Sequence, residues 1–81
     1  MPRYYFDAQD GAQFCDPDGT ELPDFAAAKR EAYKILCQLL PGKEAHVLES
    51  GTFTLTLSDE DRLVLMTLDV ATTLSPAARA L

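Results

Sequence analysis

The stretch DFAAAKREAYKILCQLL, from Asp24 to Leu40, decides the fold of this chain. Its apolar residues recur at helical spacing and form one stripe, while most of its charged residues fall on the other sides, where water can solvate them. The stripe consists of Phe25, Ala28, Ala32, Ile35 or Leu36, and Leu39. Asp24 can cap the first turn, and Pro41-Gly42 stops the helix. The stretch therefore predicts an amphipathic helix that needs a sheet to cover its apolar stripe.

Segments with strand-like alternation flank this helix on both sides. The expected strands are Arg3–Ala8, Gln13–Asp16, a brief resumption at Thr20–Leu22, Gly51–Ser58 and Arg62–Val70. Residues 43–50 have mixed charge and no clear period, so we expect a loop with Val47 and Leu48 turned inward. The order β-β-α-β-β predicts an α+β fold, a four-stranded, mainly antiparallel sheet with one long helix packed on one face. The simplest closure places the first strand between the second and the third and leaves the fourth at an edge.

The last expected strand, Arg62–Val70, differs from the strand before it. Gly51–Ser58 alternates strictly between apolar residues and threonines, which predicts one buried and one wet face. In the last strand Leu63 and Leu65 make the second face apolar as well, so we expect both faces of the strand to be buried over its first half. A long apolar edge strand invites pairing. We therefore predict a homodimer, formed through this strand or through the face that carries Tyr5, Leu63 and Leu65.

Length and charge restrict the class of protein. A chain of 81 residues makes one domain, which we expect to span residues 1–72, followed by a frayed tail over 73–81. Seven basic and thirteen acidic residues give a net charge of −6, which disfavours binding to nucleic acid or to anionic lipid. The sequence shows neither a membrane-length apolar run nor a signal peptide, so we expect a cytoplasmic protein. Cys15 and Cys37 are then expected to be reduced thiols.

Few residues suggest a catalytic, metal-binding or ligand-binding site. The segment Asp16–Glu21, DPDGTE, has alternating carboxylates like a calcium loop, but it lacks the further ligands and is interpreted as a turn. His46 has no predicted partner that would orient it for catalysis or metal binding. An alternative hypothesis gathers Tyr5, Asp7, Asp10 or His46 in a pocket between subunits. We predict no catalytic residue, cofactor site or metal site, and we leave open whether His46 or the turn has a role.

Three short motifs resemble those of a known family. They are MPRYYFD, DPDG, and ELPD leading into AAAKREA. The chain resembles a family of short bacterial proteins that open with Met-Pro-x-Tyr-Tyr/Phe-Phe-Asp and carry Gly-x-Glu-Leu-Pro-Asp before an Ala-rich helix. That family is a domain of unknown function, so the resemblance implies no catalytic residues. The chain is also similar, more weakly, to the small sheet-plus-helix domains of HicB-type antitoxins, although it lacks their separate DNA-binding segment.

These observations predict a non-enzymatic, dimeric protein-interaction or regulatory module with an acidic surface. Two alternatives stay open: a small-ligand-binding domain or enzyme with its site between subunits, and an antitoxin-like regulator. The sequence does not identify the biological process, the partner or a ligand.

Overall fold

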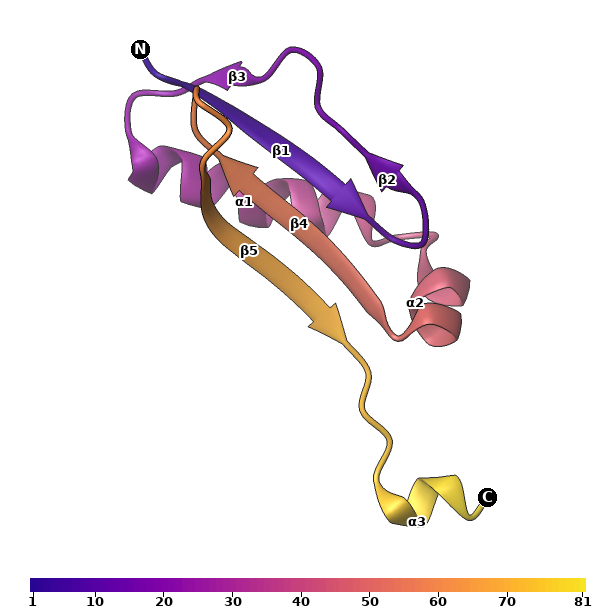
Figure 1. Ribbon diagram of the computed structural model, residues 1–81. Helices are drawn as coiled ribbons and strands as arrows, with labels where there is room; N and C mark the ends of the chain where they lie inside the picture. The colour runs from indigo at the N-terminus through magenta and orange to yellow at the C-terminus, as the bar shows by residue number, and fades with distance from the viewer.

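The computed structural model describes residues 1–81, apart from the side chain of Ser50. Within this description the chain is an α+β fold with one antiparallel five-stranded sheet and three helices (Figure 1). The elements are β1 (Arg3–Gln9), β2 (Gln13–Phe14), β3 (Thr20–Glu21), α1 (Phe25–Leu39), α2 (Glu44–Ser50), β4 (Thr52–Ser58), β5 (Val64–Ala71) and α3 (Pro76–Arg79). The predicted fold class is confirmed, but the predicted four strands and single helix match it only roughly.

The strand order of the sheet is β2-β1-β4-β5, and β3 pairs with the start of β1. All these pairings are antiparallel. As predicted, the first strand lies between the second strand and the strand that follows the helix, and β5 lies at an edge. β4 is the central strand, because β1 pairs with it along five residues and β5 along its whole length.

The predicted second strand, Gln13–Asp16, is wrong in its length. β2 contains only Gln13 and Phe14, and the chain leaves the ladder before β3 rejoins β1. Asp16 is the cause, because its carboxylate accepts the Phe6 N–H while its own N–H donates to the Asp7 carboxylate at 2.7 Å. Side chains thus take the place of two backbone ladder bonds, and the sheet has five strands instead of four.

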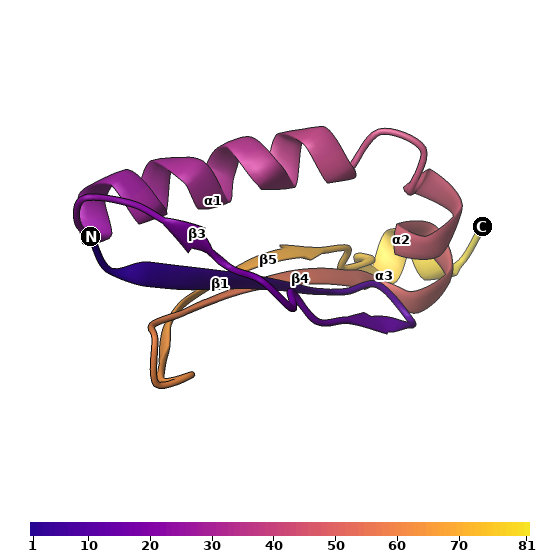
Figure 2. The ribbon, with the colours of Figure 1, turned by 90° about the horizontal axis from the view of Figure 1, so that it is seen from above.

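Helix α1 lies on one face of the sheet, as predicted (Figure 2). Asp24 is its N-cap, with its side chain accepting the Ala27 N–H at 2.9 Å. The centre of the apolar stripe, Ala28 and Ala32, is completely buried. These alanines pack against Tyr4, Phe6, Leu55 and Leu57. The ends of the stripe are more open, since Phe25 is 43% and Leu39 36% exposed.

The loop predicted over residues 43–50 is wrong, because Glu44–Ser50 forms helix α2. Glu44 lies in its first turn, where a negative charge suits the helix dipole. Gly51 ends the helix in the left-handed region with φ 82°, and its N–H donates to the Val47 carbonyl. Val47 is half-buried, but Leu48 is 76% exposed and does not turn inward.

Strand β5 is not covered on both sides, which corrects the prediction for Arg62–Val70. The strand begins at Val64, because the chain is still in the turn at Leu63. Leu63, Val64 and Leu65 are 65%, 56% and 39% exposed. The alternation of residue types indicates which face of the sheet each side chain points to. On the face opposite α1, however, no described element packs over these side chains.

The tail projects away from the sheet, and the molecule measures 52 × 21 × 21 Å (Figure 1). Its only regular element, α3, is one turn capped by Ser75. The limit at residue 72 between domain and tail stays a prediction. Among the described residues, no helix combines the length and the apolarity that crossing a membrane requires.

Removal of the α1 cap should destabilise the whole domain. We expect Asp24→Ala to lower the free energy of unfolding by about 1 kcal/mol, because the Ala27 N–H loses its acceptor. Urea denaturation followed by circular dichroism, at one fixed protein concentration, measures the change. Asp24→Ser keeps a capping oxygen and is the control. Equal stability of the alanine variant and the original chain would contradict this role.

Candidate functional site

Polar side chains gather on the face of the sheet opposite α1, next to the β4–β5 turn. In this turn Arg62 donates its N–H to the Asp59 carbonyl, and Asp59 Oδ1 accepts the N–H groups of Asp61 and Leu63, both at 2.9 Å. Arg62 adopts a left-handed backbone with φ 64°, and no other non-glycine residue among those described has a positive φ. Such a conformation costs a residue with a side chain about 1 kcal/mol or more. The hydrogen bonds within the turn and the contacts of the Arg62 side chain together offset this strain.

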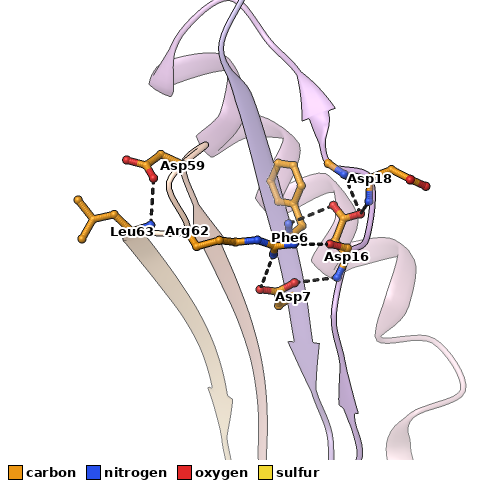
Figure 3. Close-up of polar contacts among 8 residues, drawn as sticks. Phe6, Asp7, Asp16, Asp18, Asp59, Arg62 and Leu63 are labelled. Atoms are coloured by element: carbon orange, nitrogen blue, oxygen red, sulfur yellow. Dashed lines mark hydrogen bonds and ion pairs between the residues drawn. The ribbon is translucent and has the colours of Figure 1, made fainter.

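Those contacts connect the turn to the N-terminal part of the chain. Figure 3 shows the Arg62 side chain reaching across β1 to Asp7 and Asp16. One guanidinium nitrogen lies 3.6 Å from Asp7 Oδ2, and another donates to the Asp16 carbonyl at 3.1 Å. The guanidinium also stacks on Tyr5, 3.7 Å from the ring centroid. Partly exposed contacts of these kinds contribute about 0.5–1 kcal/mol each.

Asp16 organises the DPDG turn from the inside. Its Oδ1 accepts the N–H groups of Asp18 and Gly19, and its Oδ2 accepts the Phe6 N–H. Both carboxylate oxygens are thus used within the protein, which explains this motif as a structural turn. No group of three potential metal-binding side chains occurs among the described residues.

The predicted interface residues lie in different surroundings. The ring of Tyr5 is stacked under Arg62 within the same chain. Leu63 is exposed on the side of the turn away from this cluster (Figure 3). Leu65 borders a polar depression formed with residues 2, 4 and 59–61. Their role as an interface stays a prediction, with Leu63 and Leu65 as its exposed part.

A second group of polar residues lies at the other end of β1, near the turn that leads to β2. Asp10, in the turn after β1, forms an ion pair with Lys43, which precedes α2, at 3.0 Å. The hydrogen bond from Lys43 holds the pKa of the Asp10 carboxyl below its ordinary value, and the charges of Lys43 and His46 act in the same direction. His46 is therefore near enough to influence Asp10. This pair stands at the rim of a cavity of about 540 Å³ beneath the C-terminal half of α1.

The alternative set of site residues is thus divided between two places. Tyr5 and Asp7 meet at Arg62, whereas Asp10 lies near His46 just beyond the C-terminal end of β1. Sequence reasoning did not single out Arg62 or Lys43, the basic residues that complete each group. Their acidic partners are remote in sequence, and no motif spans the distance. Cys15 and Cys37 are free thiols, and both are exposed.

Comparison with models of known protein families gives a match. The model of a domain of unknown function, DUF6894, matches residues 3–71, which include every strand and the first two helices. No curated protein and no solved structure matches the chain.

The Asp16 turn fits so closely against β1 that Gly19 cannot accept a side chain. A Cβ at Gly19 would lie 2.8 Å from the Tyr4 carbonyl oxygen and 2.9 Å from Arg3 Cγ. Gly42 has a similar positive φ, but a Cβ there would meet nothing within 4 Å. We expect Gly19→Ala to destabilise the fold by about 1–3 kcal/mol more than Gly42→Ala, because both add backbone strain and only the first adds a clash. Thermal and urea unfolding of the two variants measure the difference, and equal losses would refute the close packing of this turn.

The Asp10–Lys43 ion pair predicts a specific pH dependence. Because the folded-state pKa of Asp10 is lowered, the pair stabilises the fold above the unfolded-state pKa of this carboxyl. That contribution disappears as the pH falls through the lowered folded-state value. We expect Lys43→Met to raise the pKa of Asp10 in a ¹³C NMR titration of its carboxyl, whereas Lys29→Met, which removes a charge from α1, should leave it unchanged. An unchanged Asp10 titration in Lys43→Met would show that the ion pair is absent in solution.

Proposed function

Because the chain belongs to the DUF6894 family, a domain of unknown function, we propose its role from its own geometry. The protein acts in the cytoplasm as a non-enzymatic protein-interaction or regulatory module, and it does so as a homodimer. The observation that carries this proposal is the open edge of β5.

Strand β5 offers eight residues of backbone along one edge of the sheet. Its described pairings are all to β4, so the N–H and C=O groups on its other side have no partner strand within the chain. The strand carries no proline or lysine, the residues that commonly protect exposed edges. Three consecutive exposed apolar residues, Leu63, Val64 and Leu65, stand at its start. An edge of this kind favours the addition of another strand.

The chain exposes more surface than a compact monomer of its mass, and a second copy would bury part of it. The accessible surface is 5566 Å², whereas a folded monomer of 8.9 kDa exposes about 4,800 Å². The excess of roughly 750 Å² is close to the ~800 Å² that each partner buries in a standard interface. Part of this excess belongs to the projecting tail, which itself leaves Leu74 55% exposed.

Charge favours a two-fold, antiparallel arrangement of the two copies. The β4–β5 turn contains three carboxylates in a row, Asp59, Glu60 and Asp61, which would repel their counterparts if the two turns met. A two-fold axis through the middle of β5 places these turns at opposite ends of the dimer. It also directs the tail after Ala71 toward the turn of the other copy. The single basic residue of the tail, Arg79, then approaches the three carboxylates.

Light scattering after size exclusion tests the proposal. We expect the 81-residue chain at micromolar concentration to elute with about twice its mass of 8.9 kDa. Leu63→Lys should raise the dimer dissociation constant about tenfold or more, because it places a charge where the interface would exclude water. Leu63 is already 65% exposed in the single chain, so the fold itself should tolerate the change.

The matched control is Leu48→Lys. It makes the same substitution at a residue of α2 that is 76% exposed and lies outside β5 and its turn. A monomeric original chain, or equal effects of the two substitutions, would overturn the proposed interface.

A further inference from the structure

We infer that the cavity beneath α1 is a binding site for a small, uncharged, mainly apolar molecule that carries one hydroxyl or carbonyl oxygen. The cavity measures about 540 Å³, within the range of about 300–1,000 Å³ that small-molecule sites occupy. It lies within a single chain and on the β2 side of the sheet, whereas the proposed dimer uses the β5 edge. The ligand site and the dimer interface can therefore be tested and refuted independently.

The cavity arises from the way α1 lies on the sheet. The buried residues of the helix are Ala28 and Ala32, whose small side chains allow close approach. Toward its C-terminal end the helix lies farther from the sheet (Figure 2). There Ile35 and Leu39 form the roof of the cavity. The layer is thus packed at one end and open at the other.

The walls of the cavity are apolar and aromatic. The strands contribute Phe6, Ala8, Phe53 and Leu55 from below, and β2 contributes Phe14. Phe14 is 65% exposed, although a side chain of this size usually becomes buried when it has an apolar partner. The cavity is open to solvent, since Phe14 and Leu39 on its lining are exposed. An apolar occupant would remove these walls from water, which favours binding.

The rim determines the charge of the ligand. Its charged groups are the carboxylates of Asp10 and Asp16 and the ammonium of Lys43. An anionic ligand would therefore meet a net negative rim. A cationic ligand would compete with Lys43 for Asp10, and the Asp16 oxygens already accept three backbone N–H groups. An uncharged ligand avoids both costs.

Lys43 supplies the one specific polar contact that we assign. Its ammonium carries three N–H donors, and one of them is directed to Asp10 at 3.0 Å. The remaining donors can reach a hydroxyl or carbonyl oxygen at the rim while the body of the ligand lies against the aromatic wall. The Asp10–Lys43 pair then orients the ligand, and the apolar walls provide most of the affinity.

Three compounds with one ring system but different charge test this site. The full chain is titrated with 1-naphthol, 1-naphthoate and 1-naphthylmethylammonium, and amide shifts are followed by NMR. We expect saturable shifts around Ala8, Ile35 and Leu55 with 1-naphthol and at least tenfold weaker binding of both ions. Absence of saturable binding of 1-naphthol up to its solubility limit, or binding of either ion as tight as that of the naphthol, would overturn the inference.

Variants at three positions locate the binding. Ala8→Leu extends a half-buried wall residue into the cavity, so 1-naphthol binding should weaken tenfold or more while the fold is retained. Should Ala8→Leu fail to fold, Ile35→Phe fills the cavity from the helix side and should have the same effect. Leu63→Lys changes the β5 region and should leave 1-naphthol binding unchanged. Unchanged binding in a folded cavity-filling variant would refute the location, whatever the oligomeric state.

Discussion

The close packing of Ala28 and Ala32 on the centre of the sheet is the contact on which the rest of the structure depends. Both alanines are fully buried against side chains of β1 and β4, the two strands that hold the sheet together. Small side chains at this point bring the helix backbone near Leu55 and Leu57, which are themselves inaccessible to solvent. With the helix held tightly at one position, its angle to the strands decides how much space remains at each end. The buried core and the open cavity are therefore two results of the same contact.

The two edges of the sheet differ in the way they are completed. On one side β2 and β3 are short, and the turn between them is joined to β1 by the Asp16 carboxylate and by backbone pairs with β3. On the other side β5 is long, regular and open. This asymmetry is why association and ligand binding are assigned to opposite sides of the molecule.

Most of the fold could be predicted from sequence because its main signals are periodic. The apolar stripe of α1 and the strict alternation of β4 predicted a helix layer on a sheet layer. The hairpin connections predicted the strand order. α2 was missed because seven residues make barely two turns, too few for a period to show, although Glu44 and Gly51 marked its ends. The exposure of β5 could not be predicted, since a pattern shows which side chains share a face and not whether anything covers that face. The candidate site was the least predictable part, because Arg62 meets the Asp16 carbonyl across 46 positions of sequence.

The left-handed backbone of Arg62 also has a consequence for the order of folding. The β4–β5 hairpin is local and can form early, yet the contacts that compensate its strained turn come from Tyr5, Asp7 and Asp16 near the other end of the chain. An isolated hairpin would keep the Asp59 hydrogen bonds within the turn but would lack these side-chain contacts. The turn is therefore fully stabilised only when the first strand has docked, and the closure of this long loop couples both halves of the chain.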